Sequence, residues 1–214
     1  MVSNSGESAD RFRAPPPQQN LQRAVALAFE QLGGQADEQM IWLGAESSHG
    51  VWRLPVLDDV FGVDLAAGNI TTSSGGKVGI RWSIFTLHYL ATTSRPERQA
   101  PQTTFADLPV ARSYAGVYRA RVVSRLCGTV GRDGETLRAA ATSLGGHPVT
   151  EGDAAFDFAV FPRLSVRLIW YAPDEEFPPS ATLLLPGNID SYLCAEDIVV
   201  LSESLVSRLC GRPF

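Results

Sequence analysis

The chain has 214 residues, of which 44% are hydrophobic and 19% are charged. This length is enough for one domain with a continuous core, and a net charge of −5 with scattered arginines argues against a nucleic-acid binder. No apolar run approaches the roughly 18 residues of a membrane helix, and the 3 dispersed cysteines exclude a disulfide framework or zinc knuckle. We therefore expect a soluble, cytoplasmic protein without a membrane or nucleic-acid partner.

The N-terminal segment, residues 1–19, is polar and rich in proline and lacks the apolar core of a secretory signal. It predicts a disordered arm ahead of one domain over residues 20–214. A first amphipathic helix is predicted where apolar residues recur at helical spacing up to Gly33-Gly34; these residues are Leu21, Val25, Ala28 and Leu32. Residues 40–43 predict a short buried segment.

Three β-rich runs follow, at residues 51–57, 60–65 and 70–72. The acidic and Gly-Asn pairs between them predict hairpin turns. Pro55 cannot donate to a strand ladder, so it indicates an edge position or a bulge.

Residues 78–93 are apolar on nearly every side and predict a helix buried at the centre of the domain. This helix carries His88, whose ring must find a hydrogen-bond partner. The polar connection at residues 94–110 contains three prolines, and long ordered loops of this kind are often functional.

The remaining elements are two helices, a cluster of strands and a closing helix. A helix over residues 114–126 ends at Gly128, and a short one begins at the N-cap Asp133. Alternation predicts strands at 156–160 and 166–170 around a Pro162-Arg163 corner, a third run at 181–185, and an amphipathic helix at 195–209. Because strands cluster, we expect a single α+β domain with a mostly antiparallel sheet packed against about five helices, one of them buried.

Several segments in this order resemble one family: VFGVDLAAGNI, LHYL, FADLP followed by YAGVYRARV, GDAAFDFAVFPRLSVRLIW, DEEFPPSATLLL and YLCAEDIVVLSESLV. Together they are similar to the bacterial and archaeal family called domain of unknown function 3786. The resemblance implies a context of corrinoid and iron–sulfur proteins in one-carbon metabolism, and hence a cofactor-handling or binding role. The chain departs from the family pattern at Cys194, where a capping Ser or Thr is expected, and it has no cysteine-rich extension for a cluster.

Three features are candidates for chemistry. The loop Asp174, Glu175, Glu176 could supply an acid, a base or cation ligands, or be a solvated turn. His88 could pair with Glu175 or Glu176, or be a structural histidine bonded to a backbone carbonyl. Cys194, at a helix N-terminus, could be a reactive thiolate or simply replace a capping hydroxyl. The histidines and cysteines show no metal-ligand spacing, and no cofactor is identified.

Two functions of different class follow. The first is a small-molecule or cofactor-binding accessory protein with a pocket between the helix at 78–93 and the strand at 166–172. Its predicted ligand-binding residues, which core packing would explain equally, are Trp82, Tyr89, Tyr118, Trp170, Tyr171 and Asp174. The alternative is a small enzyme that uses His88 with Glu175 or Glu176 as catalytic acid and base. A protein partner or a homo-oligomer stays open.

Overall fold

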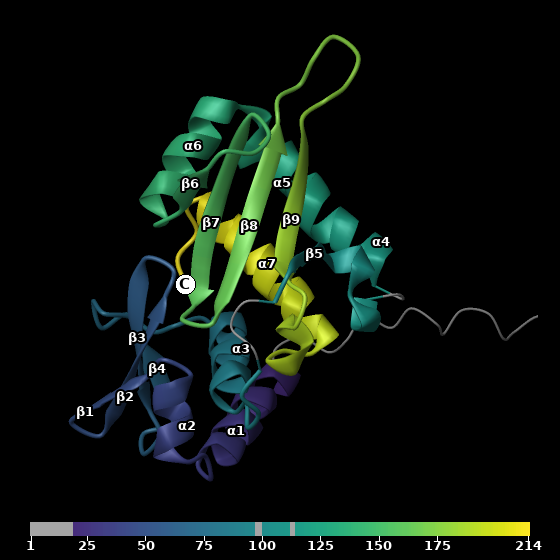
Figure 1. Cartoon of the computed structure of the whole chain (residues 1–214). Helices are drawn as coiled ribbons and strands as arrows, with labels where there is room; N and C mark the ends of the chain where they lie inside the picture. The colour runs from purple at the N-terminus through teal and green to yellow at the C-terminus, as the bar shows by residue number, and fades with distance from the viewer. Residues whose placement is uncertain (1–18, 97–99, 112–113) are drawn as a thin grey trace, which may run out of the picture.

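The structure is a computed structural model that describes residues 19–96, 100–111 and 114–214. The predicted N-terminal arm lies outside the described residues except for Gln19, which begins the first helix. The α+β class and the antiparallel pairing are confirmed, and the strands divide between two sheets (Figure 1).

The first sheet has the order β1-β2-β3-β4 and is antiparallel throughout. Two helices, α1 (Gln19–Leu32) and α2 (Asp37–Trp42), precede it. Its strands are β1 (Glu46–Ser48), β2 (Val51–Val56), β3 (Asp59–Asp64) and β4 (Asn69–Thr71). Pro55 pairs with Val60 of β3, whereas β1 reaches only residues 51–53 of β2. The proline therefore occupies an edge position, as its missing N–H requires.

The second sheet has the order β5-β9-β8-β7-β6 and is also antiparallel. Its strands are β5 (Gln102–Thr104), β6 (His147–Val149), β7 (Ala154–Phe161), β8 (Leu164–Tyr171) and β9 (Ser180–Pro186). The corner Pro162-Arg163 joins β7 to β8, with Phe161 opposite Leu164. Val166, Leu168 and Trp170 are all buried, which confirms the predicted inward face of β8.

Helices cover one face of this second sheet, with α5 and α7 behind β7, β8 and β9 in the view of Figure 1. They are α4 (Ala115–Tyr118), α5 (Ser124–Gly128), α6 (Gly134–Ser143) and α7 (Ala195–Leu209). The Asp133 side chain accepts a 2.8 Å hydrogen bond from the Thr136 N–H, which confirms the predicted N-cap of α6. The other face carries the Arg167–Asp157 and Arg167–Glu151 ion pairs.

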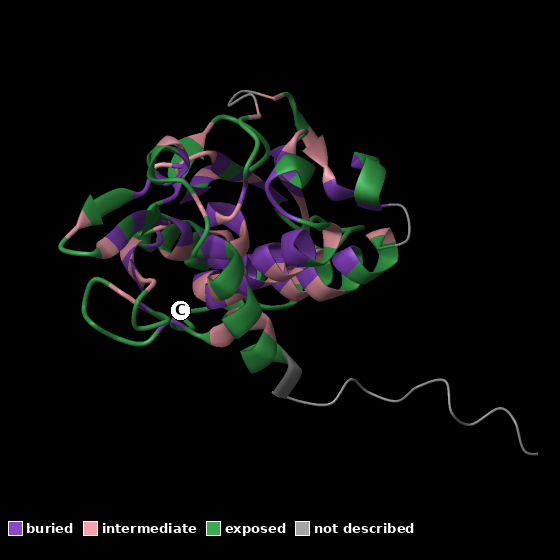
Figure 2. Ribbon diagram, turned by 90° about the horizontal axis from the view of Figure 1, so that it is seen from below, coloured by how far each residue is buried: buried purple, intermediate pink, exposed green. Residues whose placement is uncertain are grey.

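Helix α3 (Ile80–Leu90) lies between the two sheets and is the buried helix that the sequence predicts. Trp82 and Phe85 are in edge-to-face contact, and Tyr89 stacks on Phe161 of β7 at 4.4 Å between ring centroids. Figure 2 shows the buried residues concentrated in the interior, with exposed residues on the outer loops and helix faces. This packing makes α3 the element that both sheets share.

Candidate functional site

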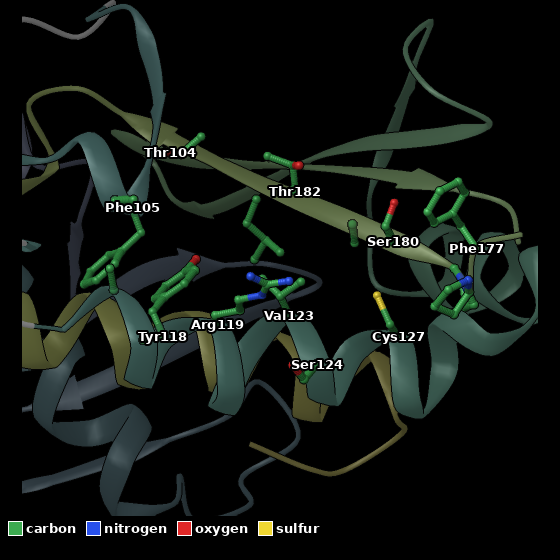
Figure 3. Close-up of a pocket in the computed structure, with 17 residues that line it drawn as sticks. Thr104, Phe105, Tyr118, Arg119, Val123, Ser124, Cys127, Phe177, Ser180 and Thr182 are labelled. Carbon is green, nitrogen blue, oxygen red and sulfur yellow. The ribbon is translucent and has the colours of Figure 1, made fainter.

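A groove of about 940 Å³ lies beside β9, and we call it the β9 groove. One wall is β9 with the end of β5, and the other is the helical segment from α4 to α5. Figure 3 shows Phe105 and Tyr118 at one end of this groove and Phe177 at the other. The residues that line it are Thr104–Ala106, Ala115, Gly116, Tyr118, Arg119, Val123, Ser124, Cys127 and Phe177–Leu183.

The β9 groove runs along the edge of the sheet and not over one face. Four consecutive residues, Ser180–Leu183, line it, and successive side chains of a strand point to opposite faces. β5 pairs only with residues 184–186 of β9. Within the described chain, β8 is therefore the only strand paired with Ser180–Leu183. We call this four-residue segment the open edge.

The helical wall of the groove contains an irregular turn. Between α4 and α5 the chain forms a π-helical stretch, η3 (Arg119–Val123). The sequence predicts one continuous helix here, and the structure inserts the wider turn into it. Such π segments are rare and occur often at functional sites. Arg119 and Val123, the first and last residues of η3, both line the groove.

Tyr118 anchors this wall. Its ring stacks on Phe105 with centroids 4.2 Å apart and an interplanar angle of 5°. Its hydroxyl lies 3.1 Å from Ser202 Oγ of α7, and burial raises the pKa of Tyr118 to about 12. The phenol is therefore neutral and fixed, so it shapes the groove and does not supply an acid or base at neutral pH.

The polar groups at the groove are few. Arg119 is exposed on the helical wall. Burial raises the pKa of the Cys127 thiol, which disfavours the reactive thiolate. Phe177 is 65% exposed at the far end.

The acidic loop adjoins this far end. Asp174 Oδ1 accepts hydrogen bonds from the N–H groups of Glu176 and Phe177, at 2.9 and 2.7 Å. Asp174 is thus a turn-forming residue, whereas Glu175 and Glu176 are exposed. The acidic residues therefore lie next to the β9 groove, without lining it, and do not contact His88.

The predicted ligand-binding aromatics are not all brought together. Tyr118 lines the β9 groove. Trp82, Tyr89 and Trp170 are at most 5% exposed, and the Trp170 indole donates to the carbonyl of Gly131 at 2.8 Å. Tyr171 is 45% exposed, on the uncovered face of the sheet. Core packing therefore explains three of these residues, and the groove lies beside β9 and not between α3 and β8.

His88 pairs with a carboxylate, and that carboxylate is Asp197. His88 Nδ1 lies 2.7 Å from Asp197 Oδ2, and the Cys194 thiol donates to the same oxygen at 3.3 Å. The expected pairing with Glu175 or Glu176 is not formed, because the β8–β9 loop projects from the end of the second sheet that lies away from α3 (Figure 1). Asp197, the third residue of α7, is 11% exposed in its side chain and His88 is 34% exposed.

The hydrogen bond that His88 donates to Asp197 is the main reason why the pKa of His88 is raised, against the lowering effect of burial. Burial, together with the Asp197 carboxylate, raises the pKa of the Cys194 thiol. Desolvation and the nearby negative charge therefore outweigh the helix dipole, which on its own would favour a thiolate at this helix N-terminus. Cys194 makes no side-chain capping bond to α7.

Sequence reasoning missed Asp197, Arg119 and the open edge. The sequence did contain a signal for Asp197, because Glu196-Asp197 is an acidic pair in the first turn of a predicted helix. The open edge had none, because it depends on where the three-residue β5 stops. Among the described residues, no cluster of three or more His, Cys, Asp or Glu side chains is arranged to hold a metal ion. No helix in those ranges has the length and apolar character of a membrane span.

Comparison with known families gives one match. A family model described as "Domain of unknown function (DUF3786)" matches residues 36–208. Parallel searches of curated proteins and of solved structures found no match. The matched range includes α3, the β9 groove and the His88–Asp197 pair.

Proposed function

The chain belongs to the DUF3786 family, whose description names no reaction, and we propose that it is a non-catalytic accessory protein whose ligand lies in the β9 groove. The observation that carries this proposal is the open groove of about 940 Å³ beside a strand segment that, within the described chain, is paired on one side only. Binding sites are usually concave, mostly apolar and provided with a few placed polar groups. The β9 groove has this composition, with Arg119 as its charged group.

The part of the ligand that the groove holds is slender and largely apolar. It carries a negative group for Arg119, the one cation among the described residues that line the groove. A corrinoid held through its metal does not fit, because the described lining contains no histidine and the Cys127 thiol is held protonated by burial. The corrinoid context that the family resemblance implies is therefore tested separately, with cobalamin as a competitor.

A dye that is aromatic and anionic, anilinonaphthalene sulfonate, tests the groove directly. Gly116 lines the groove, and an added Cβ there meets no atom within 4 Å. Gly116→Leu therefore places a side chain in the groove from a position where the Cβ has open space. We expect it to weaken dye binding about tenfold, equal to about 1.4 kcal/mol.

Gly128→Leu is the matched control, because Gly128 ends the same helical segment, also has open space, and does not line the groove. It should leave dye affinity unchanged. Cobalamin, added as a competitor, should not displace the dye. Equal dye binding by wild type and both variants would contradict the groove as the binding site.

A second candidate function, acid–base catalysis, rests on the 2.7 Å contact between His88 Nδ1 and Asp197 Oδ2. The carboxylate fixes the ring, and the described residues give His88 Nε2 no hydrogen-bond partner. Oriented imidazoles of this kind act as general bases and contribute about 10²–10⁴-fold. Hydrolysis of p-nitrophenyl acetate is the assay, with His88→Gln against His147→Gln, an exposed histidine elsewhere. Equal rates in the two variants would remove this candidate.

A further inference from the structure

We propose that the natural ligand of the β9 groove is an extended peptide segment of a partner protein, bound as an added strand along the open edge Ser180–Leu183. This inference rests on the proposed function, since it names the ligand class of the same groove. Strand addition to an exposed sheet edge is a recurrent mode of peptide recognition, in which main-chain hydrogen bonds supply affinity.

The backbone of the open edge is available for pairing. Residues of an antiparallel strand direct their N–H and C=O groups alternately to the two sides. β8 pairs with the backbone N–H and C=O groups on one side of β9, in the register from Leu168↔Leu183 to Tyr171↔Ser180. Two of the four residues in Ser180–Leu183 therefore direct their polar backbone groups into the β9 groove. A peptide strand can satisfy these groups, whereas an apolar small molecule cannot.

The groove also sets the length and direction of the added strand. β5 runs antiparallel to β9 and ends at Thr104, opposite Leu184, where the chain turns into η1 (Phe105–Asp107). A peptide that continues this line begins beside Thr104 and ends beside Phe177. Four residues at about 3.3 Å each span the open edge.

The open edge lacks two of the features that usually protect a strand from unwanted pairing, charged residues and proline. Natural sheets place charged residues or proline on their edges. The outer strand on the opposite side of the same sheet, β6, contains Pro148 and is three residues long. In contrast, the open edge reads Ser-Ala-Thr-Leu, without charge or proline. Protection at one edge and its lack at the other favours a partner at β9.

The charges around the groove specify the peptide. Arg119 follows Tyr118 on the helical wall, one side chain in from the Phe105 end (Figure 3), and the exposed carboxylates of Glu175 and Glu176 lie in the loop that leads to Phe177. An antiparallel peptide therefore carries an acidic residue near its amino end and a basic residue near its carboxyl end. Its middle is apolar, because the helical wall presents Val123 there (Figure 3).

The probe is a fluorescein-labelled peptide with both ends blocked, of sequence Glu-Val-Ile-Val-Lys, measured by fluorescence polarisation with the full chain. Two derivatives carry N-methyl groups, one on the second and fourth residues and one on the third and fifth. Since alternate amides face β9, only one derivative loses the hydrogen bonds to the open edge. We expect that derivative to bind at least about tenfold more weakly and the other to change less than about threefold.

The possible results distinguish a wrong ligand class from a wrong binding site. Equal affinity of both derivatives, or equal loss in both, overturns strand pairing. Absence of peptide binding while anilinonaphthalene sulfonate still binds and is blocked by Gly116→Leu overturns the peptide but keeps the groove. Absence of both kinds of binding defeats the proposed function itself. Gly116→Leu should weaken the unmodified peptide, and Gly128→Leu should not.

Discussion

His88 is a partly buried imidazole whose protonation is set by one carboxylate from another helix. Asp197 raises its pKa, and this effect exceeds the lowering by burial. The C-terminal turn of α3, where His88 lies, also favours a positive charge. The pair joins α3 to the first turn of α7, and it is therefore a structural tie whether or not the free Nε2 takes part in chemistry.

The His88–Asp197 pair predicts a pH-dependent stability. A histidine whose folded pKa is raised adds stability that is fully present below the unfolded value near 6.5 and is lost as pH rises through the folded value. His88→Gln should therefore cost more at pH 5.5 than at pH 8.5. The difference should be about 1 kcal/mol or less, because solvent screens a partly exposed pair.

Urea denaturation at the two pH values measures this difference. The control is His147→Gln, in which an exposed histidine is removed. A cost of His88→Gln that is equal at both pH values, or larger at pH 8.5, would show that the pair does not stabilise the protonated ring.

Gly116 gives a second prediction at the scale of one residue. A glycine inside a helix costs roughly 0.5–1 kcal/mol relative to alanine, and a Cβ at Gly116 meets nothing within 4 Å. Gly116→Ala should therefore raise the free energy of unfolding by that amount. In contrast, Gly131→Ala should lower it, because its Cβ would lie 2.9 Å from the Leu126 carbonyl oxygen. Denaturation curves of the two variants check the opposite signs.

At the scale of single residues, the sequence predicts that His88 needs a hydrogen-bond partner, but it does not predict which residue provides it. An imidazole in an apolar helix had to be satisfied, and His88 is. Its partner lies 109 residues further along the chain, and nothing in local periodicity indicates which of several carboxylates arrives there. The acidic loop was the more conspicuous choice because three carboxylates stand together in it.

Among the elements, the β7–β8 corner packs the second sheet against α2 and the turn that follows it. Arg163 at this corner lies over the Trp42 ring at 3.6 Å and donates to the Trp42 carbonyl. Gly44 approaches the same corner with φ of +92°, and a Cβ there would lie 2.4 Å from Pro162 Cβ. The contact therefore needs both the left-handed backbone and the missing side chain.

Gly44→Ala should destabilise the chain by about 2–4 kcal/mol, through backbone strain and overpacking together. Gly50→Ala separates the two contributions, since Gly50 has φ of +80° but open space around its Cβ. It should cost only about 1 kcal/mol. Thermal and urea unfolding of both variants measure how much each substitution lowers the free energy of unfolding. Equal losses would show that the contact with Pro162 does not contribute.

Long, strongly patterned elements were predictable from the sequence. The closing helix is α7 at its predicted bounds, Ala195–Leu209, because its apolar stripe and its flanking residues agree. The three-residue strands β1, β5 and β6 were not predicted. A strand of that length shows too little alternation to be read, and its pairing depends on longer strands elsewhere in the chain.

On the scale of the whole molecule, the candidate site exists because one strand is shorter than its neighbour. β9 has seven residues and β5 covers only the last three. The helical segment from α4 to α5 stands beside the uncovered part and closes it into a groove. The α+β class follows from the order of helices and strands in the sequence. The groove does not, since it depends on how far two distant segments overlap.

The most direct measurement is amide hydrogen exchange over Ser180–Leu183, with and without the Glu-Val-Ile-Val-Lys peptide. In the free protein, the two amides that β8 does not pair should exchange rapidly, while the other two are protected. Saturating peptide should slow the exposed pair at least about tenfold and leave β6 unchanged. Unaltered exchange of those amides in a peptide-bound protein, or slow exchange of all four before any peptide is added, would contradict the account.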